Sequence, residues 1–306
     1  MKKQSAVSAP LQDKIFYVCN YVFWVIILLA TLYPLYFVLI ASVSNAFAVV
    51  QGEVTIWPVG FTLSGYESLI KFTQLWRSYL NSIVYTVLGT FMGVTLTLMA
   101  AYATTHNFLG KAVFNFIVIF TMFFSGGLIA TWLVVKDVLH LYDNPLILIL
   151  TWPTVWKLML TRVFIKTTIP NELYEAATLD GASHFYYFSK VVMPLCGTII
   201  AVLCVYIGVD KWNDYFSGLI YIRSQEWLPL QTVLRTILAS LQVQNADLIN
   251  ANVNKMDRFE DYTAALRRAE LAKYCIIVVS TAPAVALYVA MQKYFVKGVM
   301  IGSIKG

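Results

Sequence analysis

The residues best suited to specific chemistry lie in one polar stretch of the chain, residues 166–194. Pro170 favours a helix start, and Glu172 and Glu175 fall in the first turn, where the helix dipole favours negative charge. Gly181 permits the left-handed turn that ends such a helix, and a second helix begins beyond it. We expect a helix–turn–helix with a low-relief surface of small residues that the groove of another protein could accept. Its carboxylates could pair with basic groups on that protein.

The other reactive side chains form no catalytic or metal-binding pattern. The cysteines lie inside apolar runs without zinc or redox spacing, and the histidines are far apart, each at the end of a segment. There is no Ser/His/Asp or paired-carboxylate arrangement in the apolar segments and no G-x-x-x-x-G-K-[ST] phosphate loop. We therefore expect no catalytic residue, metal ion or cofactor on this chain. These cysteines and histidines are Cys19, Cys196, Cys204, Cys275, His106, His140 and His184.

The composition is that of an integral membrane protein. Of 306 residues, 59% are hydrophobic and only 12% are charged, with a mean hydropathy of +0.70. Soluble domains carry about 25% charged residues, so this chain has too little polar surface to cover a water-soluble particle. A soluble enzyme, a nucleic-acid binder and a disordered scaffold are thereby excluded.

Six apolar segments are long enough to cross a bilayer, which takes about 20 residues. They are expected to be helices, because lipid cannot satisfy the hydrogen bonds of free backbone. The expected spans are 15–41, 80–104, 112–135, 145–164, 191–209 and 274–292. Together they define an all-α transmembrane domain over 15–294. The polar parts of the chain are an N-terminus 1–14, a loop 166–190, a long loop 210–273 and a tail 295–306.

The distribution of charge predicts the orientation of the spans. With a cytoplasmic N-terminus, the inner segments hold eleven basic residues against four acidic ones, and the outer segments hold eleven against twelve. The positive-inside rule then places both termini in the cytoplasm. This puts 166–190 inside and 210–273 outside, with Lys157 and Arg162 marking the inner end of the fourth span.

Three motifs resemble those of bacterial ABC importer permeases. The loop resembles the family's EAA motif, EAA-x3-G-x9-I-x-LP, with Val and Met in place of Ile and Leu. Two further stretches are similar to the carbohydrate branch, the "WNDYF" after the fifth span and the closing Gln-Lys…Gly-x-x-Lys-Gly tail. The matching residues are Glu175-Ala176-Ala177, Asp180-Gly181-Ala182, Val191, Met193-Pro194, Trp212–Phe216 and Gln292–Gly306.

This resemblance implies a type I ABC importer permease of the maltose-type family, namely the smaller permease, in the branch for polysaccharide-derived oligosaccharides. Its expected partners are a second, larger permease, an ABC ATPase dimer that binds ATP and Mg, and an extracellular or periplasmic sugar-binding protein. It implies no nucleic acid, and its expected location is the bacterial cytoplasmic membrane, in contact with lipid. In a chain without a partner, the same polar loop would be a solvated amphipathic surface.

The resemblance also implies two sets of ATPase contacts. The coupling loop would dock in a groove of the ATPase, and the tail would enter the ATPase dimer interface. The implied loop contacts are Glu175, Ala176, Ala177, Asp180, Gly181, Ala182 and Pro194, and those of the tail are Gly302, Lys305 and Gly306. A frayed cytoplasmic end is the alternative for the tail.

Candidates for the substrate path are aromatic or amide residues, because sugars stack their apolar faces on rings and give their hydroxyls to amides. Tyr33 and Tyr36 flank a proline in the first span, Trp152 and Trp156 flank another in the fourth, and Asn213 lies near the outer mouth. Packing in the core or in the interfacial aromatic belt is the alternative role for each of them. The outer segments 126–144 and 242–268 are candidates for docking the binding protein.

Two other functions remain as alternatives. An ABC importer permease for a non-sugar solute shares the EAA loop, and only the two carbohydrate-type motifs argue against it. An ion-coupled secondary transporter would need ionisable groups within the membrane, and the spans are nearly free of these away from their ends.

Overall fold

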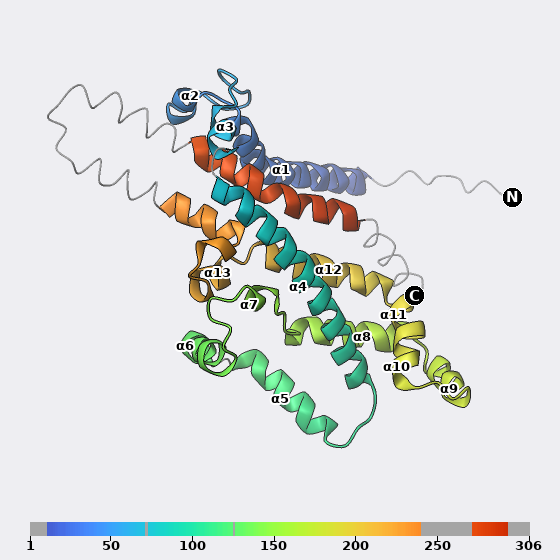
Figure 1. Cartoon of the computed structure of the whole chain (residues 1–306). Helices are drawn as coiled ribbons and strands as arrows, with labels where there is room; N and C mark the ends of the chain where they lie inside the picture. Colours follow the sequence, from blue (N-terminus) through green and yellow to red (C-terminus); the bar gives the residue numbers. More distant parts are fainter. Residues whose placement is uncertain (1–10, 71–72, 125, 240–270, 293–306) are drawn as a thin grey trace. The chain divides into compact units, whose positions relative to one another are not determined.

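The computed structural model describes residues 11–70, 73–124, 126–239 and 271–292, in which every regular element is helical (Figure 1). The chain divides into two compact units. In the described residues, the first unit comprises 11–70 and 271–278, and the second comprises 73–124, 126–239 and 279–292.

The first unit is built on α1 (Leu11–Ser42), followed by the short helices α2 (Ala46–Val50) and α3 (Ser64–Ile70). Tyr66 on α3 donates a hydrogen bond from its hydroxyl to Ser42 Oγ at 2.8 Å, at the end of α1. Cys275 Sγ donates to the Ser42 carbonyl at 3.4 Å. The end of α1 is therefore the point at which the segments of this unit meet.

The second unit is organised around α4 (Thr73–Thr105), whose 33 residues make a helix about 50 Å long. Against it pack α8 (Val155–Thr168) and α12 (Gly197–Trp212). The other elements are α5 (Lys111–Phe123), α6 (Gly127–Leu133), η1 (Val134–Val138), α7 (Leu146–Ile149), α9 (Asn171–Leu179), α10 (His184–Tyr187), η2 (Phe188–Val192), α11 (Met193–Leu195), α13 (Tyr215–Tyr221), η3 (Gln225–Trp227) and the helix Leu230–Ala239. The helix Leu271–Gln292 continues from the first unit.

Glycines let α4 and α12 come close together. A Cβ at Gly93 would lie 2.6 Å from Thr151 Cγ2 and 3.1 Å from Ile207 on α12. A Cβ at Gly208 would lie 2.8 Å from Leu287. Small residues at such contacts allow the close backbone approach that stabilises helix pairs in lipid.

The expected number of six unbroken spans is not reached in the described residues. Three helices there are long and apolar enough to cross a membrane, and two bent pairs raise the number to five. The long helices are Gln12–Ser42, Thr73–Thr105 and Leu271–Gln292, and the bent pairs are Lys111–Phe123 with Gly127–Val138 and His184–Leu195 with Gly197–Trp212. The expected fourth span is divided into α7 and α8, because 150–154 is not helical and includes Pro153, whose nitrogen cannot donate a helix hydrogen bond.

The described part of the expected outer loop 210–273 is folded against α4. Leu230 N–H donates to Ser82 Oγ at 2.7 Å, and Tyr85 Oη donates to the Trp227 carbonyl at 3.1 Å. Residues 215–239 thus cover the N-terminal half of α4 rather than forming an open connection. Hydropathy did not predict this packing against α4, because the segment is polar and its helices are short.

Candidate coupling surface and substrate face

The expected helix–turn–helix is formed by α9, a glycine turn and α10. Gly181 has a φ of +75°, and its N–H donates to the Thr178 carbonyl while Ala182 N–H donates to the Ala177 carbonyl. This pair of bonds is a Schellman turn, which satisfies the last carbonyls of a helix. Ser183 then caps α10 by accepting a hydrogen bond from Tyr186 N–H. The reversal of the chain is therefore encoded locally, at Gly181 and Ser183.

The predicted coupling residues lie on the outside of this turn. Glu175, Ala176, Asp180 and Gly181 are exposed, whereas Ala177 and Ala182 are half-buried. The side chain of Leu179 is 90% exposed and that of Phe185 is 72% exposed. We name the exposed surface of residues 175–185 the coupling surface. It combines carboxylates with unusually exposed apolar groups, a pairing typical of docking surfaces.

The opposite side of the turn packs on an aromatic cluster that sequence analysis missed. His106, just beyond α4, packs at a tilt against Tyr174 and edge-on against His184, with ring centroids 4.9 and 5.1 Å apart. Tyr102 Oη and Tyr174 Oη lie 3.4 Å from Nδ1 and Nε2 of His184, respectively. Because His106 and His184 are 78 positions apart in sequence, no local pattern could have placed them together.

These rings border a cavity of about 680 Å³ at the C-terminal end of α4. The cavity wall also includes Lys111 and Lys166, and the Nε2 atom of His106 is buried without a hydrogen-bond partner among the described residues. Burial, followed by the charges of His184 and Lys111, lowers the pKa of His106 below its ordinary value. The ring is therefore held neutral at pH 7, which suits a packed joint rather than a charged one.

Pro194 lies where the coupling loop continues into the membrane helices. The helix from His184 to Leu195 includes the π-helical turn η2 and meets α12 at a bend of 81° beside Cys196. Tyr187, Phe188 and Val192 on this segment are buried against α4. A displacement of the coupling surface would therefore be transmitted directly to α12.

Lys211, which we expected at the start of the outer loop 210–273, lies beside the middle of α4. Gly89 is the central residue of α4, and a Cβ there would lie 3.2 Å from Lys211 Cε. Lys211 Nζ donates to the carbonyls of Leu148 and Leu150 at 2.8 and 2.9 Å. These bonds satisfy carbonyls where the helix α7 ends, so this lysine has a structural role.

Lys157 does not mark the inner end of the fourth span, as the sequence had suggested. It lies in the first turn of α8, and its Nζ forms an ion pair with Asp210 Oδ2 on α12 at 2.6 Å. Arg162 lies further along α8 and donates to Asn115. Sequence analysis missed the ion pair because Lys157 and Asp210 each fall near a predicted span boundary.

The candidate path residues divide between the two units. Trp156 on α8 packs edge-on against Tyr206 on α12, with ring centroids 5.2 Å apart. Trp152 and Asn213, also in the second unit, are both exposed. Tyr33 and Tyr36, in the first unit, donate hydrogen bonds to the carbonyls of Thr55 and Ile56. Their hydroxyls thus hold a loop.

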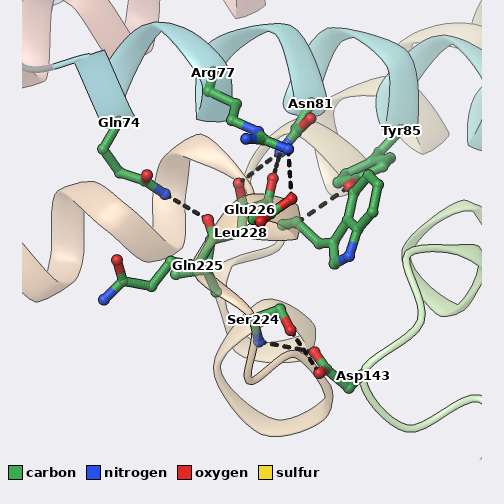
Figure 2. A network of polar contacts seen from close by, with 10 residues as sticks. Gln74, Arg77, Asn81, Tyr85, Asp143, Ser224, Gln225, Glu226 and Leu228 are labelled. Carbon is green, nitrogen blue, oxygen red and sulfur yellow. Dashed lines mark hydrogen bonds and ion pairs between the residues drawn. The ribbon is translucent and has the colours of Figure 1, made fainter.

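The N-terminal end of α4 is held by a polar network (Figure 2). Gln74, Arg77, Asn81 and Tyr85 face the segment 225–228, where Arg77 pairs with Glu226 at 2.8 Å. Most of these bonds go to backbone carbonyls of residues 225–228, so they depend on the backbone conformation of that segment rather than on its side chains.

Asp143 ties this network to the loop before α7. Its Oδ1 accepts from the N–H groups of Arg223 and Ser224, and its Oδ2 accepts from the Ser224 hydroxyl at 2.7 Å (Figure 2). Hydrogen bonds from the hydroxyl and N–H of Ser224 lower the pKa of Asp143 below its ordinary value. His140 and Asp143 both have positive φ, a conformation that non-glycine residues adopt only when their surroundings hold it.

Some of the predicted residues fall outside the described part of the chain. The tail residues Gly302, Lys305 and Gly306 lie outside the described residues, as does segment 242–268. In the part of the chain that the structure describes, no three His, Cys, Asp or Glu residues come together in a way that could hold a metal ion.

Comparison with known proteins matches residues 93–301 to the family model described as binding-protein-dependent transport system inner membrane component. Protein LplC of Bacillus subtilis is 34% identical over 96% of both chains. The polygalacturonan/rhamnogalacturonan transport system permease protein YtcP of the same organism is 31% identical over 97% of this chain and 100% of the relative.

A solved structure gives the same result. A chain of a bacterial ABC transporter involved in the import of the acidic polysaccharide alginate superposes with a TM-score of 0.78 and 31% identity, over 94% of this chain and 98% of that one. The predicted type I importer fold is thereby confirmed. The chain belongs to the family of binding-protein-dependent transport system inner membrane components, the permease subunits of ABC importers.

Proposed function

We propose that this permease carries an oligosaccharide across the bacterial cytoplasmic membrane and that its coupling surface docks on an ABC ATPase dimer. Like other members of its family, the chain is a non-catalytic membrane subunit, and separate subunits hydrolyse ATP. ATP and Mg would be bound there. A second permease would complete the path, and an extracellular binding protein would deliver the sugar.

The observation that carries the ATPase assignment is the exposure of the coupling surface. Leu179 and Phe185 expose most of their apolar side chains to solvent beside the carboxylates of Glu175 and Asp180. Such an arrangement is costly in water and becomes favourable when a partner covers the apolar groups and pairs with the charges.

The substrate assignment is supported by the named relatives. One of them transports polygalacturonan or rhamnogalacturonan according to its name, and the solved relative takes part in alginate import. All three matches extend over nearly the whole chain, including the segments around α8 and α12. We infer an oligosaccharide released from a polysaccharide, without choosing its sugar.

The test is co-purification of the ATPase with the two permeases from a strain that expresses all three. Gly181→Asp forces a side chain into the left-handed turn and adds a charge at the centre of the coupling surface. Its matched control is Gly110→Asp, because Gly110 also has a positive φ (+82°) and a Cβ added at either glycine would meet open space. The two substitutions therefore carry a similar backbone strain, of roughly 1–2 kcal/mol.

We expect the ATPase to remain bound to the wild type and to Gly110→Asp, and to be lost from Gly181→Asp. Equal retention by all three would contradict the docking of this surface. If docking holds, uptake of candidate sugars by the complete complex in proteoliposomes tests the substrate class. Coupled uptake of non-sugar solutes alone would favour the alternative of a different ABC importer.

A further inference from the structure

A polar stripe runs along the exposed face of α12. Tyr206, Asp210 and Asn213 are spaced by four and three residues, so they lie on one side of the helix. Tyr206 is 45% exposed, and the side chain of Asp210 is 67% exposed. The opposite side of α12 is packed, with Ala201, Gly208 and Trp212 all buried.

Part of the stripe lies beside the middle of a helix long enough to cross a membrane. Lys211, which follows Asp210, contacts the central residue of the 33-residue helix α4. An ionised side chain inside the hydrocarbon region of a bilayer is too costly to face lipid, so it must face water or another protein chain. The exposed carboxylate of Asp210 therefore marks a surface that is not lipid-facing.

The ion pair with Lys157 is asymmetric in its exposure. The Lys157 side chain is only 12% exposed, whereas that of Asp210 is 67% exposed. The lysine contacts Oδ2 at 2.6 Å, and among the described residues Oδ1 accepts no hydrogen bond. The pair is neutral as a whole, yet it presents carboxylate oxygens to the space beside α12.

Aromatic rings flank this carboxylate. Trp156, next to Lys157 in sequence, and Tyr206, one turn before Asp210, meet at an interplanar angle of 89° and remain about half exposed. Apolar ring faces suit the CH groups of a sugar, and a carboxylate is a strong acceptor for hydroxyls. The two chemistries that a saccharide requires are thus adjacent.

We propose that Asp210, together with Trp156 and Tyr206, forms a saccharide contact on the translocation path that favours neutral sugar units over uronates. Sugar hydroxyls donate to the Asp210 carboxylate, while a sugar carboxylate placed there is repelled. Lys157 is a positioning residue that holds Asp210. This inference rests on the proposed function, because it takes the transported solute to be a sugar.

The first experiment asks whether Asp210 faces water, and it needs no knowledge of the sugar. Asp210→Cys is placed in a chain in which Cys19 and Cys204 are replaced by serine, and the complete complex in proteoliposomes is treated with a membrane-impermeant cationic methanethiosulfonate. We expect labelling at position 210 and none at native Cys196, which is fully buried. No labelling of position 210 from either side, with or without trapped nucleotide, would show that it faces the partner permease and overturn the proposal.

The second experiment measures uptake of a neutral trisaccharide, raffinose, and an acidic disaccharide, digalacturonate. We expect Asp210→Asn to raise the half-saturating concentration of raffinose about fivefold and to lower that of digalacturonate. The matched control is Glu53→Gln, an exposed carboxylate of the first unit, which should change neither value. A raffinose value unchanged by Asp210→Asn would overturn the proposed contact.

A purely structural ion pair is distinguished by reversing it. Lys157→Asp combined with Asp210→Lys keeps the pair but presents an ammonium to the path, so preference should shift towards digalacturonate. Wild-type preference in this double variant would mean that the pair only joins α8 and α12. A wild-type complex with ATPase bound that takes up neither these probes nor any other candidate sugar would instead refute the sugar assignment of the proposed function, and the saccharide part of this inference with it.

Discussion

The two ends of α4 are held in contrasting ways. At its N-terminal end, Gln74 to Tyr85 form directional hydrogen bonds to the backbone of residues 225–228 (Figure 2). At its C-terminal end, Tyr102 and His106 pack against the rings of Tyr174 and His184, with polar contacts no shorter than 3.4 Å and a cavity beside them.

This difference indicates which end can move. Hydrogen bonds to backbone fix both distance and direction, whereas stacked rings tolerate small shifts at little cost and a cavity leaves room for them. The end next to the coupling surface is therefore the adjustable one, and the other end serves as the anchor. Under the proposed docking, the motion of ATPase closure would enter at α9, next to this adjustable end.

The largest loss of stability is expected from Asp143→Ala, which would break the anchor. It removes all three hydrogen bonds that hold Arg223 and Ser224, and hydrogen bonds to a charged group contribute about 1.5–3 kcal/mol. We expect the free energy of unfolding in SDS to fall by about 2–3 kcal/mol. Asp137→Ala, an exposed carboxylate before the same loop, should change it by less than about 0.5 kcal/mol. Equal effects of the two would mean that the Asp143 contacts do not stabilise the anchor.

A smaller loss is expected from Ser82→Ala, on the same half of α4. This change leaves the buried N–H of Leu230 without its acceptor, at a cost of about 1–2 kcal/mol. Ser78→Ala, one turn earlier, is the matched control, because the Ser78 hydroxyl is buried and has no hydrogen-bond partner in the described part of the chain. Its removal should be neutral or stabilising in the same SDS titration. A stabilising Ser82→Ala would refute the anchoring role of this bond.

Much of the fold could be predicted from the sequence, because long apolar runs and motif spacing are local properties. The glycine turn at 181 and the start of α9 follow from residues within a few positions of each other. The broken fourth span was missed because Pro153 lies inside a run whose average hydropathy remains high. Hydropathy averages over the break and cannot detect it.

The two clusters of the candidate site could not be predicted in this way. His106 with His184, and Lys157 with Asp210, depend on contacts between α4, α8, α12 and the coupling loop. Each of these charged or aromatic residues is, by itself, compatible with an interfacial position. The expected coupling loop could be singled out because its residues lie in one contiguous motif, whereas the residues of these two clusters come from separate helices.

A pH change should affect the adjustable end before the anchor. The pKa of His106 is lowered in the folded protein, so the unfolded state binds a proton more readily than the folded state. The folded protein therefore loses stability as pH falls below about 6.5, the ordinary pKa of histidine. The pKa of Asp143 is also lowered, so its contribution persists until pH falls through the ordinary range of a carboxyl group, near 3.8, and below. The groups facing His106 are Tyr102, Tyr174, His184 and Lys111.

Between pH 7.5 and 5.5, we therefore expect the midpoint of thermal unfolding to fall in the wild type and to fall less in His106→Asn. His140→Asn, which changes a histidine outside the ring cluster, should keep the wild-type slope. An unchanged slope in His106→Asn would assign the pH effect to other groups.

The smallest effects come from removing one hydroxyl at each end of α4, and their ratio measures the contrast most directly. Tyr85→Phe loses a 3.1 Å hydrogen bond to the Trp227 carbonyl and should cost about 1 kcal/mol. Tyr174→Phe loses only a 3.4 Å contact with His184 and keeps the ring packing, so its cost should be below about 0.5 kcal/mol. SDS titration of both variants compares their free energies of unfolding, and binding-protein-stimulated ATPase activity shows whether Tyr174→Phe still couples.

If Tyr174→Phe is the more destabilising of the two, the C-terminal end of α4 is held by polar bonds after all. The motion from the ATPase would then have to pass through a rigid joint, with α12 moving as one body with α4.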